Sequence, residues 1–148
     1  MTNLETSLTK HFDKRLVAAF LILSFIGFLD AAYLASAHYA GLSVKCFING
    51  CEAVLTSQYA AIAGIPVALL GAIYYLIIFI FIIAYLDFKK EFFMNFAVRL
   101  AIVGFIVSLL LMSIQIFIIK ALCLYCFVSF IIFTILFVSG LFILNKNK

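Results

Sequence analysis

The sequence predicts an all-α membrane protein, built as a bundle of four transmembrane helices with a short interfacial helix in the first outward loop. Of the 148 residues, 68% are hydrophobic and only 11% are charged, which is too little charge to cover a soluble domain. Four apolar runs each approach the length of about 20 residues that a helix needs to cross the hydrocarbon core. The length suits one domain, so residues 1–148 form a single transmembrane domain.

The four predicted spans are joined by connections of unequal length. The spans cover residues 16–39, 66–86, 98–119 and 123–144. Residues 40–65 form the long first connection, residues 87–97 form a short charged loop, and a tight turn around Lys120 joins the last two spans. Residues 52–63 favour a helix that is too short to span, so we expect this helix to lie at the membrane interface.

The distribution of Lys and Arg predicts the orientation. Eight of the ten lie in the amino tail, at the second connection or in the carboxyl tail, whereas Lys45 and Lys120 lie in the other connections. Lys-rich and Arg-rich loops stay cytoplasmic. We therefore expect an integral, multi-pass protein, in the inner membrane of a bacterium, with cytoplasmic termini and an active site that faces the periplasm or exterior. Basic residues spread thinly along the chain do not indicate nucleic acid as a partner.

A secretory signal peptide is the alternative interpretation of the first apolar run. Three basic residues precede the run, and Ala35-Ser36-Ala37 resembles a cleavage site. The run is longer than the apolar core of a signal peptide. We therefore favour an uncleaved first helix.

All four cysteines fall on the expected outward side, where disulfides persist. Cys46 and Cys51 lie in the long loop, and Cys123 and Cys126 lie where the fourth span begins. At the amino terminus of a helix, free backbone N–H groups and the helix dipole stabilise a thiolate. The thiolate is the species that attacks a disulfide. Cys123-Leu-Tyr-Cys126 therefore predicts a redox-active pair.

Three other interpretations of the cysteines are open. Free cysteines are common core residues. The pair Cys46 and Cys51, which flanks an Asn49-Gly50 turn, suits a structural staple as well as a shuttle. Four thiolates can bind structural zinc, but the four-residue spacing of the first pair disfavours this, and we predict no metal. Two pairs on one membrane face favour redox chemistry over the other interpretations.

Two cysteine pairs beside a membrane predict an electron relay. A loop pair can accept electrons from a soluble dithiol protein, and a helix-anchored pair can pass them to an acceptor in the lipid. Thiols deliver two electrons, and a lipid-soluble quinone accepts two. Most aromatic residues in such a chain face lipid or fill the bundle. Four are nevertheless candidates for the wall of a quinone pocket: Tyr74, Tyr75, Phe127 and Phe130.

Asp30 is the one acidic residue inside the predicted spans. It lies about 20 Å along the helix from Arg15, and thus toward the outward surface. Intramembrane carboxylates are functional candidates, so Asp30 is a candidate proton relay; contact with water or a helix partner is the structural alternative. Gln115 is expected to serve helix packing, and three glycines are expected to permit close helix contacts: Gly27, Gly71 and Gly104.

The ordered set of motifs resembles the vitamin K epoxide reductase family, and its bacterial disulfide-forming members most closely. The set comprises the loop pair, Cys51-Glu-Ala-Val-Leu-Thr-Ser57, Gly64-Ile-Pro66, Gly71-Ala-Ile-Tyr-Tyr75 and the final Cys-Leu-Tyr-Cys. It extends over most of the chain. Each motif alone is weak, but the ordered set is quite specific.

The resemblance implies a role for each cysteine and for one hydroxyl residue near them. Cys46 meets the partner's thiol, Cys51 exchanges with Cys123, and Cys126 lies nearest the quinone. Ser57 matches a family Ser or Thr near the active cysteines.

Two positions depart from the family pattern. Val67 stands where the family commonly has an Asn that bonds a quinone carbonyl, and Phe130 stands where vertebrate members have a Tyr. Both departures remove hydrogen-bond donors.

We therefore expect an enzyme, a membrane thiol–quinone oxidoreductase that supports disulfide bond formation. It would reoxidise a thioredoxin-like dithiol protein on the outward side and reduce ubiquinone, menaquinone or vitamin K within the lipid. One alternative is a vitamin K epoxide or quinone reductase of the same fold. The other is a non-enzymatic membrane scaffold with structural disulfides.

Overall fold

Four long helices make up most of the structure, a computed structural model that describes residues 14–40, 58, 61–62, 64–120 and 123–146. In these residues a π-helical segment, η2, continues the third helix, and a short hairpin of β1 and β2 precedes the second. The elements are α2 (Lys14–Ala40), β1 (Ala61–Ile62), β2 (Ile65–Pro66), α4 (Val67–Phe88), α5 (Glu91–Ile114), η2 (Gln115–Ile119) and α6 (Leu124–Lys146). All four helices are long and apolar enough to cross a membrane. The chain is therefore an all-α integral membrane protein, as predicted.

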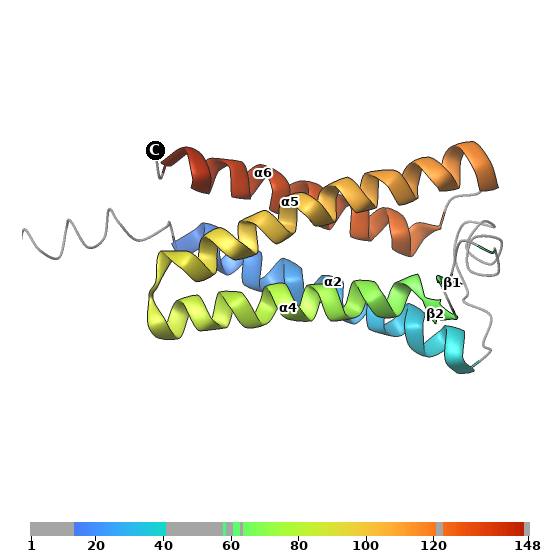
Figure 1. Cartoon of the computed structure of the whole chain (residues 1–148), viewed down its shortest axis with the longest axis horizontal. Coiled ribbons are helices and arrows are strands. Elements are labelled where there is room, and N and C mark those ends of the chain that lie inside the picture. The colour runs from blue at the N-terminus through green and yellow to red at the C-terminus, as the bar shows by residue number, and fades with distance from the viewer. Residues whose placement is uncertain (1–13, 41–57, 59–60, 63, 121–122, 147–148) are drawn as a thin grey trace, which may run out of the picture.

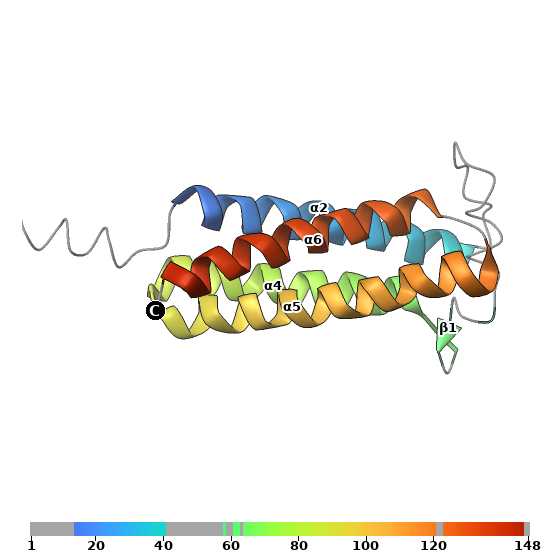
Figure 2. The ribbon, with the colours of Figure 1, turned by 90° about the horizontal axis from the view of Figure 1, so that it is seen from above.

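The four helices pack side by side as one bundle (Figures 1 and 2). The most extensive contacts are those of α2 with α4 and of α5 with α6, and contacts of α4 with α5 and of α2 with α6 close the bundle. One end of the bundle holds the start of α2, the α4–α5 turn and the end of α6 (Figure 1). The opposite end holds the hairpin and the start of α6, and the two helix-anchored cysteines lie there.

The connection between α4 and α5 is shorter than predicted. The charged loop expected over residues 87–97 is reduced to Lys89 and Lys90, because α5 already begins at Glu91. Met94 and Ala97 are fully buried in the bundle. Burial of these two side chains stabilises the helix up to the charged turn. The charged residues at that turn made the start of α5 look like part of a loop in the sequence.

The predicted interfacial helix over residues 52–63 lies mostly outside the described residues. At its end the structure shows a strand instead, because Ala61 pairs with Pro66 and Ile62 pairs with Ile65 in an antiparallel hairpin. Gly64 allows this reversal, since its φ of 84° lies in the region that glycine adopts without steric cost. Pro66 then precedes the first residue of α4, a position where its missing N–H group costs no helical hydrogen bond.

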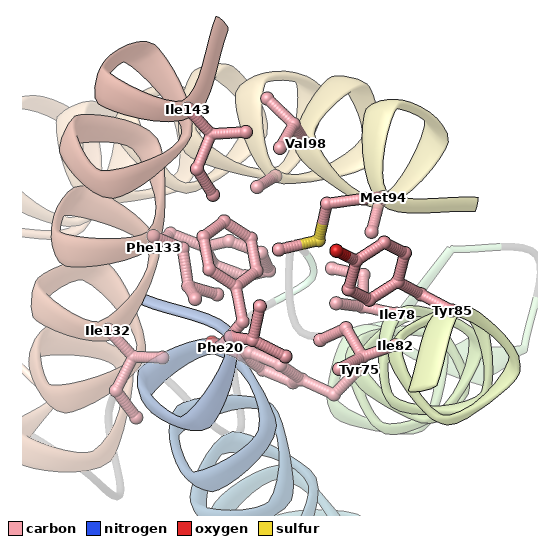
Figure 3. Packing of buried hydrophobic residues seen from close by; sticks show 14 of the residues in the cluster. Phe20, Tyr75, Ile78, Ile82, Tyr85, Met94, Val98, Ile132, Phe133 and Ile143 are labelled. Carbon is pink, nitrogen blue, oxygen red and sulfur yellow. The ribbon is translucent and has the colours of Figure 1, made fainter. Parts of the chain in front are cut away.

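The core between the helices is apolar and aromatic, and Figure 3 shows that all four helices contribute to it. The rings of Tyr75 and Phe133 stack with centroids 4.6 Å apart. A Cβ at Gly27 would overlap the Tyr75 ring, and a Cβ at Gly104 would overlap the Phe133 ring. These two glycines therefore permit close packing between helices, as predicted.

Candidate functional site

Cys123 and Cys126 sit at the amino terminus of α6, with both thiols free. Cys123 directly precedes the helix and is fully buried, and its carbonyl accepts the backbone N–H of Phe127 at 3.0 Å. The backbone N–H groups of Tyr125 and Cys126 donate to the Cys123 sulfur. The Cys123 side chain thus caps N–H groups that have no partner within a helix. The predicted helix-terminal thiol pair is present in the structure.

This position makes Cys123 acidic. The hydrogen bond from the Cys126 thiol is the largest influence, and together with the backbone N–H groups it outweighs burial and lowers the pKa of Cys123 to about 7. A weak opposing effect comes from the carboxylate of Asp30. A substantial fraction of Cys123 is therefore thiolate at neutral pH, which makes it a ready nucleophile for disulfide exchange.

Gln115 contacts both cysteines from the end of the third helix. Its Oε1 atom accepts the backbone N–H of Cys123 at 3.2 Å, and its side chain also hydrogen-bonds to Cys126. The side chain is only 4% exposed. Gln115 begins η2, which ends where Lys120 adopts a left-handed conformation with φ of 57°. The sequence analysis assigned Gln115 to helix packing. The one signal in the sequence was an amide inside an apolar span, eight residues before Cys123.

Cys126 lines a cavity of about 600 Å³ between the helices. This volume lies within the range of about 300–1,000 Å³ that small-molecule sites occupy. Along α4 the lining extends from Val67 to Tyr75, a rise of about 12 Å at 1.5 Å per residue. The polar lining residues are few: His38, Gln58, Tyr74, Tyr75, Ser108, Gln115 and Ser129. The cavity is therefore an apolar site with a free thiol, that of Cys126, in its wall.

The structure brings two of the four aromatic candidates to this cavity. Tyr74 and Tyr75 line it, and their hydroxyl groups donate to the carbonyls of Leu100 and Ser129, the latter at 3.3 Å. The other two lie elsewhere. Phe127, at 45% exposure, points away from the bundle.

Phe130 also lies apart from the cavity lining. Its ring stacks on that of Phe105 with centroids 6.0 Å apart. Val67, which replaces the Asn of the family pattern, does line the cavity. The apolar side chain thus stands at the cavity wall.

Asp30 is tied to the helix that carries the cysteines. The hydroxyl of Ser129 donates to Asp30 Oδ2 at 3.1 Å. Ser129 is three residues after Cys126, so the two lie on the same face of α6, and both line the cavity. The structural alternative for Asp30, contact with a helix partner, is confirmed, and this contact also connects the carboxylate to the cavity wall.

Three predicted site residues lie outside the described residues: Cys46, Cys51 and Ser57. Gln58, which follows Ser57, is described and lines the cavity, as does Pro66. Within the described part of the chain, no three His, Cys, Asp or Glu side chains lie close enough together to bind a metal ion.

Comparison with family models finds one that matches most of the chain. It is the model of the vitamin K epoxide reductase family, which matches residues 18–141, from the first helix into the last. The matched range includes all four cysteines and every residue that lines the cavity. Comparison with curated proteins finds no match.

Proposed function

Because the chain belongs to the vitamin K epoxide reductase family, whose members are membrane oxidoreductases that generally use quinones, we propose that it moves two electrons from a thioredoxin-like dithiol protein to a membrane quinone. The observation that carries the proposal is the placement of the thiol pair. Cys123 caps the helix next to Cys126, and Cys126 opens into an apolar cavity of about 600 Å³. This pair can thus exchange with the loop pair through Cys123 and reach a lipid-soluble acceptor through Cys126.

The electrons enter by disulfide exchange. The partner's thiolate attacks the Cys46–Cys51 disulfide, and a second partner thiol completes the partner's own disulfide and leaves the loop pair reduced. Cys51 then attacks the sulfur of Cys123, which breaks the Cys123–Cys126 disulfide and frees Cys126 as a thiolate. Attack by Cys46 on Cys51 restores the loop disulfide and releases Cys123. Each exchange breaks one disulfide and forms one, so two electrons move at each stage.

The electrons leave when the second pair closes again. Cys126 faces the cavity, where its sulfur would react with the quinone. The Cys123 thiolate would then displace the reduced quinone from the Cys126 sulfur, so that the S–S bond forms as the bond between Cys126 and the quinone breaks. Formation of this disulfide releases two electrons and two protons, which convert quinone to quinol. The lowered pKa of Cys123, about 7, supports its role as the closing nucleophile.

Ser129 and Asp30 would relay one of the two protons that the thiols release in this step. The Ser129 hydroxyl lies in the cavity wall and hydrogen-bonds to Asp30. A proton passed from Asp30 through the hydroxyl of Ser129 reaches the face of the helix that carries Cys126. This path gives the intramembrane carboxylate a function in addition to its contact with α6.

The cavity lining indicates how a quinone would be held. Val67 offers no hydrogen bond, and the hydroxyls of Tyr74 and Tyr75 already donate to backbone carbonyls. Apolar contacts therefore supply most of the binding, with His38 and Gln58 as candidate donors to a quinone oxygen. This lining suits the flat, apolar head group that ubiquinone, menaquinone and vitamin K share.

The same proposal sets the orientation in the membrane. Of the described basic residues, Arg15 lies near the start of α2 and Lys89 and Lys90 form the α4–α5 turn, at the end of the bundle opposite the cysteines (Figure 1). Lys120, which ends η2, lies at the cysteine end. The basic end is then cytoplasmic. In a bacterial inner membrane, the cysteines face the periplasm or exterior, where the partner is found.

The test is quinone reduction by the purified protein with a reduced thioredoxin-like protein as donor. Each single Cys→Ser variant should lose activity with the protein donor. Cys46→Ser and Cys51→Ser should still reduce quinone when a small dithiol replaces the partner, because such a dithiol can attack the second pair directly. Ser113→Ala is the matched control, since its hydroxyl donates to Leu109 O of its own helix. Wild-type activity in Cys126→Ser would refute the relay.

A further inference from the structure

Gln115 is an exception among the polar side chains of the bundle. Among the described residues, only Ser24 and Gln115 are buried polar side chains. Ser24 bonds to Leu21 O of its own helix at 3.0 Å, which is the usual local solution for a buried hydroxyl. Gln115 instead extends to another helix and bonds to both redox cysteines. Burial of an amide without hydrogen-bond partners costs free energy. The contacts with the two cysteines offset this cost for Gln115.

The two contacts of Gln115 use the two ends of its amide. The oxygen accepts the backbone N–H of Cys123, a group that precedes the first turn of α6 and has no helical partner. The nitrogen is the group that can donate to the Cys126 sulfur. Hydrogen bonds to an ionised sulfur are stronger than those to a neutral thiol. The same side chain therefore fixes the backbone of one cysteine and favours the thiolate of the other.

The backbone at Gln115 is itself unusual. The third helix changes from α-helical to π-helical geometry at this residue, and the N–H of Lys120 bonds to its carbonyl. π-Helical turns inside helices occur often at functional sites. Here the change coincides with the residue that contacts the cysteine pair, and Gln115 and Cys126 both line the cavity.

We propose that Gln115 is a positioning residue for electron transfer, which anchors Cys123 and donates a hydrogen bond that orients the Cys126 sulfur toward the cavity and stabilises its thiolate when that forms. This inference rests on the proposed function only for the identity of the acceptor. The reactivity of Cys126 toward a small electrophile is measured without quinone or partner. A failure of the relay and a failure of this inference are thus distinguishable.

The test is the rate at which N-ethylmaleimide alkylates Cys126 in a background in which Cys46, Cys51 and Cys123 are replaced by Ser. Gln115→Met keeps the length of the side chain and removes both hydrogen bonds. Loss of a hydrogen bond to an ionised group should slow alkylation about tenfold at mildly alkaline pH. Ser113→Ala, two residues away, should stay within about twofold of the background rate.

A second variant separates the contacts. Gln115→Glu is nearly isosteric and retains an oxygen for the N–H of residue 123, but an ionised carboxylate cannot donate to Cys126. Its alkylation should be at least as slow as that of Gln115→Met. This variant also carries the test if Gln115→Met does not fold.

The outcomes divide clearly. Slow alkylation in the Gln115 variants, together with a reduced kcat and little changed KM for quinone in the four-cysteine protein, supports the positioning role. Background alkylation rates in a folded Gln115 variant would overturn it, even if thermal stability fell, because Gln115 would then be structural. Slow alkylation in these variants combined with no quinone reduction by the wild type would refute the relay alone.

Discussion

Gly104→Ala tests whether two stacked rings define the inner part of the cavity. A Cβ at Gly104 would lie within 2.8 Å of three carbons of the Phe133 ring, well inside the 3.4–4 Å of ordinary contact. The ring has little room to move away, because it stacks on Tyr75 at 4.6 Å. The Tyr75 ring in turn lies against the backbone at Gly27. The extra methyl group must therefore strain both rings.

The size of the effect follows from a matched comparison with Gly71→Ala. The nearest atom to a Cβ at Gly71 is the Cβ of Ala31 at 3.8 Å, an ordinary contact. Both substitutions replace a helical Gly by Ala, so any gain in helix propensity of about 1 kcal/mol cancels between them. The remaining difference is the cost of overpacking, about 1–3 kcal/mol. Gly104→Ala should thus be less stable than Gly71→Ala by this amount.

The assay is equilibrium unfolding in mixed micelles, with helix content as the signal. Gly71→Ala should equal or exceed the wild type in free energy of unfolding, and Gly104→Ala should fall below both. Equal unfolding free energies for the two variants would show that the Phe133 ring moves freely, and the described ring stack would then not define the cavity.

Three further predictions concern the cysteines, the carboxylate and the turn. The hydrogen bond from the Cys126 thiol is the main reason that the pKa of Cys123 lies near 7, so the Cys123 thiolate should form as the pH rises through about 7. Cys126→Ala should move this transition to higher pH, as measured by the ultraviolet absorbance of the thiolate with Cys123→Ser as the blank. An unchanged transition would contradict the assignment. Ser129→Ala removes the hydroxyl that bonds to Asp30 and should slow quinone reduction while leaving reduction of the cysteine pair by a small dithiol unchanged; a wild-type quinone rate would exclude the proton path. Lys120→Gly relieves a left-handed non-glycine conformation and should raise the free energy of unfolding by about 1 kcal/mol. Lys89, at the opposite end of the bundle, has a φ of 52°, and Lys89→Gly should have the same effect. A loss of stability in both variants would contradict the presence of backbone strain at these residues.

Much of the architecture was predictable because the bilayer imposes a length on every helix. Apolar runs of the required length predicted four spans, and the described residues include four helices long and apolar enough to cross a membrane. The helix-terminal position of Cys123 followed from its place at the start of the last run. The start of α5 was harder to predict, because the charges near Lys89 and Lys90 suggest a longer loop. Only the burial of Met94 shows that the helix begins directly after these two residues.

Helical periodicity also failed to predict two contacts between segments that are close in the sequence. Residues 61–62 belong to a stretch whose composition favours a helix, but they pair with residues 65–66 across the turn at Gly64. The sequence assigned Gln115 to helix packing, whereas in the structure its amide oxygen accepts the backbone N–H of Cys123. Neither contact has a periodic signal, because each depends on how two segments are brought together.

The sequence by itself determined four apolar runs long enough to cross a membrane and a cysteine pair at the start of the last run, because apolar length and residue order are properties of the chain alone. Only the tertiary structure decided which side of each helix faces the cavity. It placed Tyr75 in the cavity wall and Phe127 outside it. The physical reason is that lipid and protein interior are both apolar, so a membrane helix is hydrophobic on every side and its pattern does not distinguish the two. Packing between helices makes that choice.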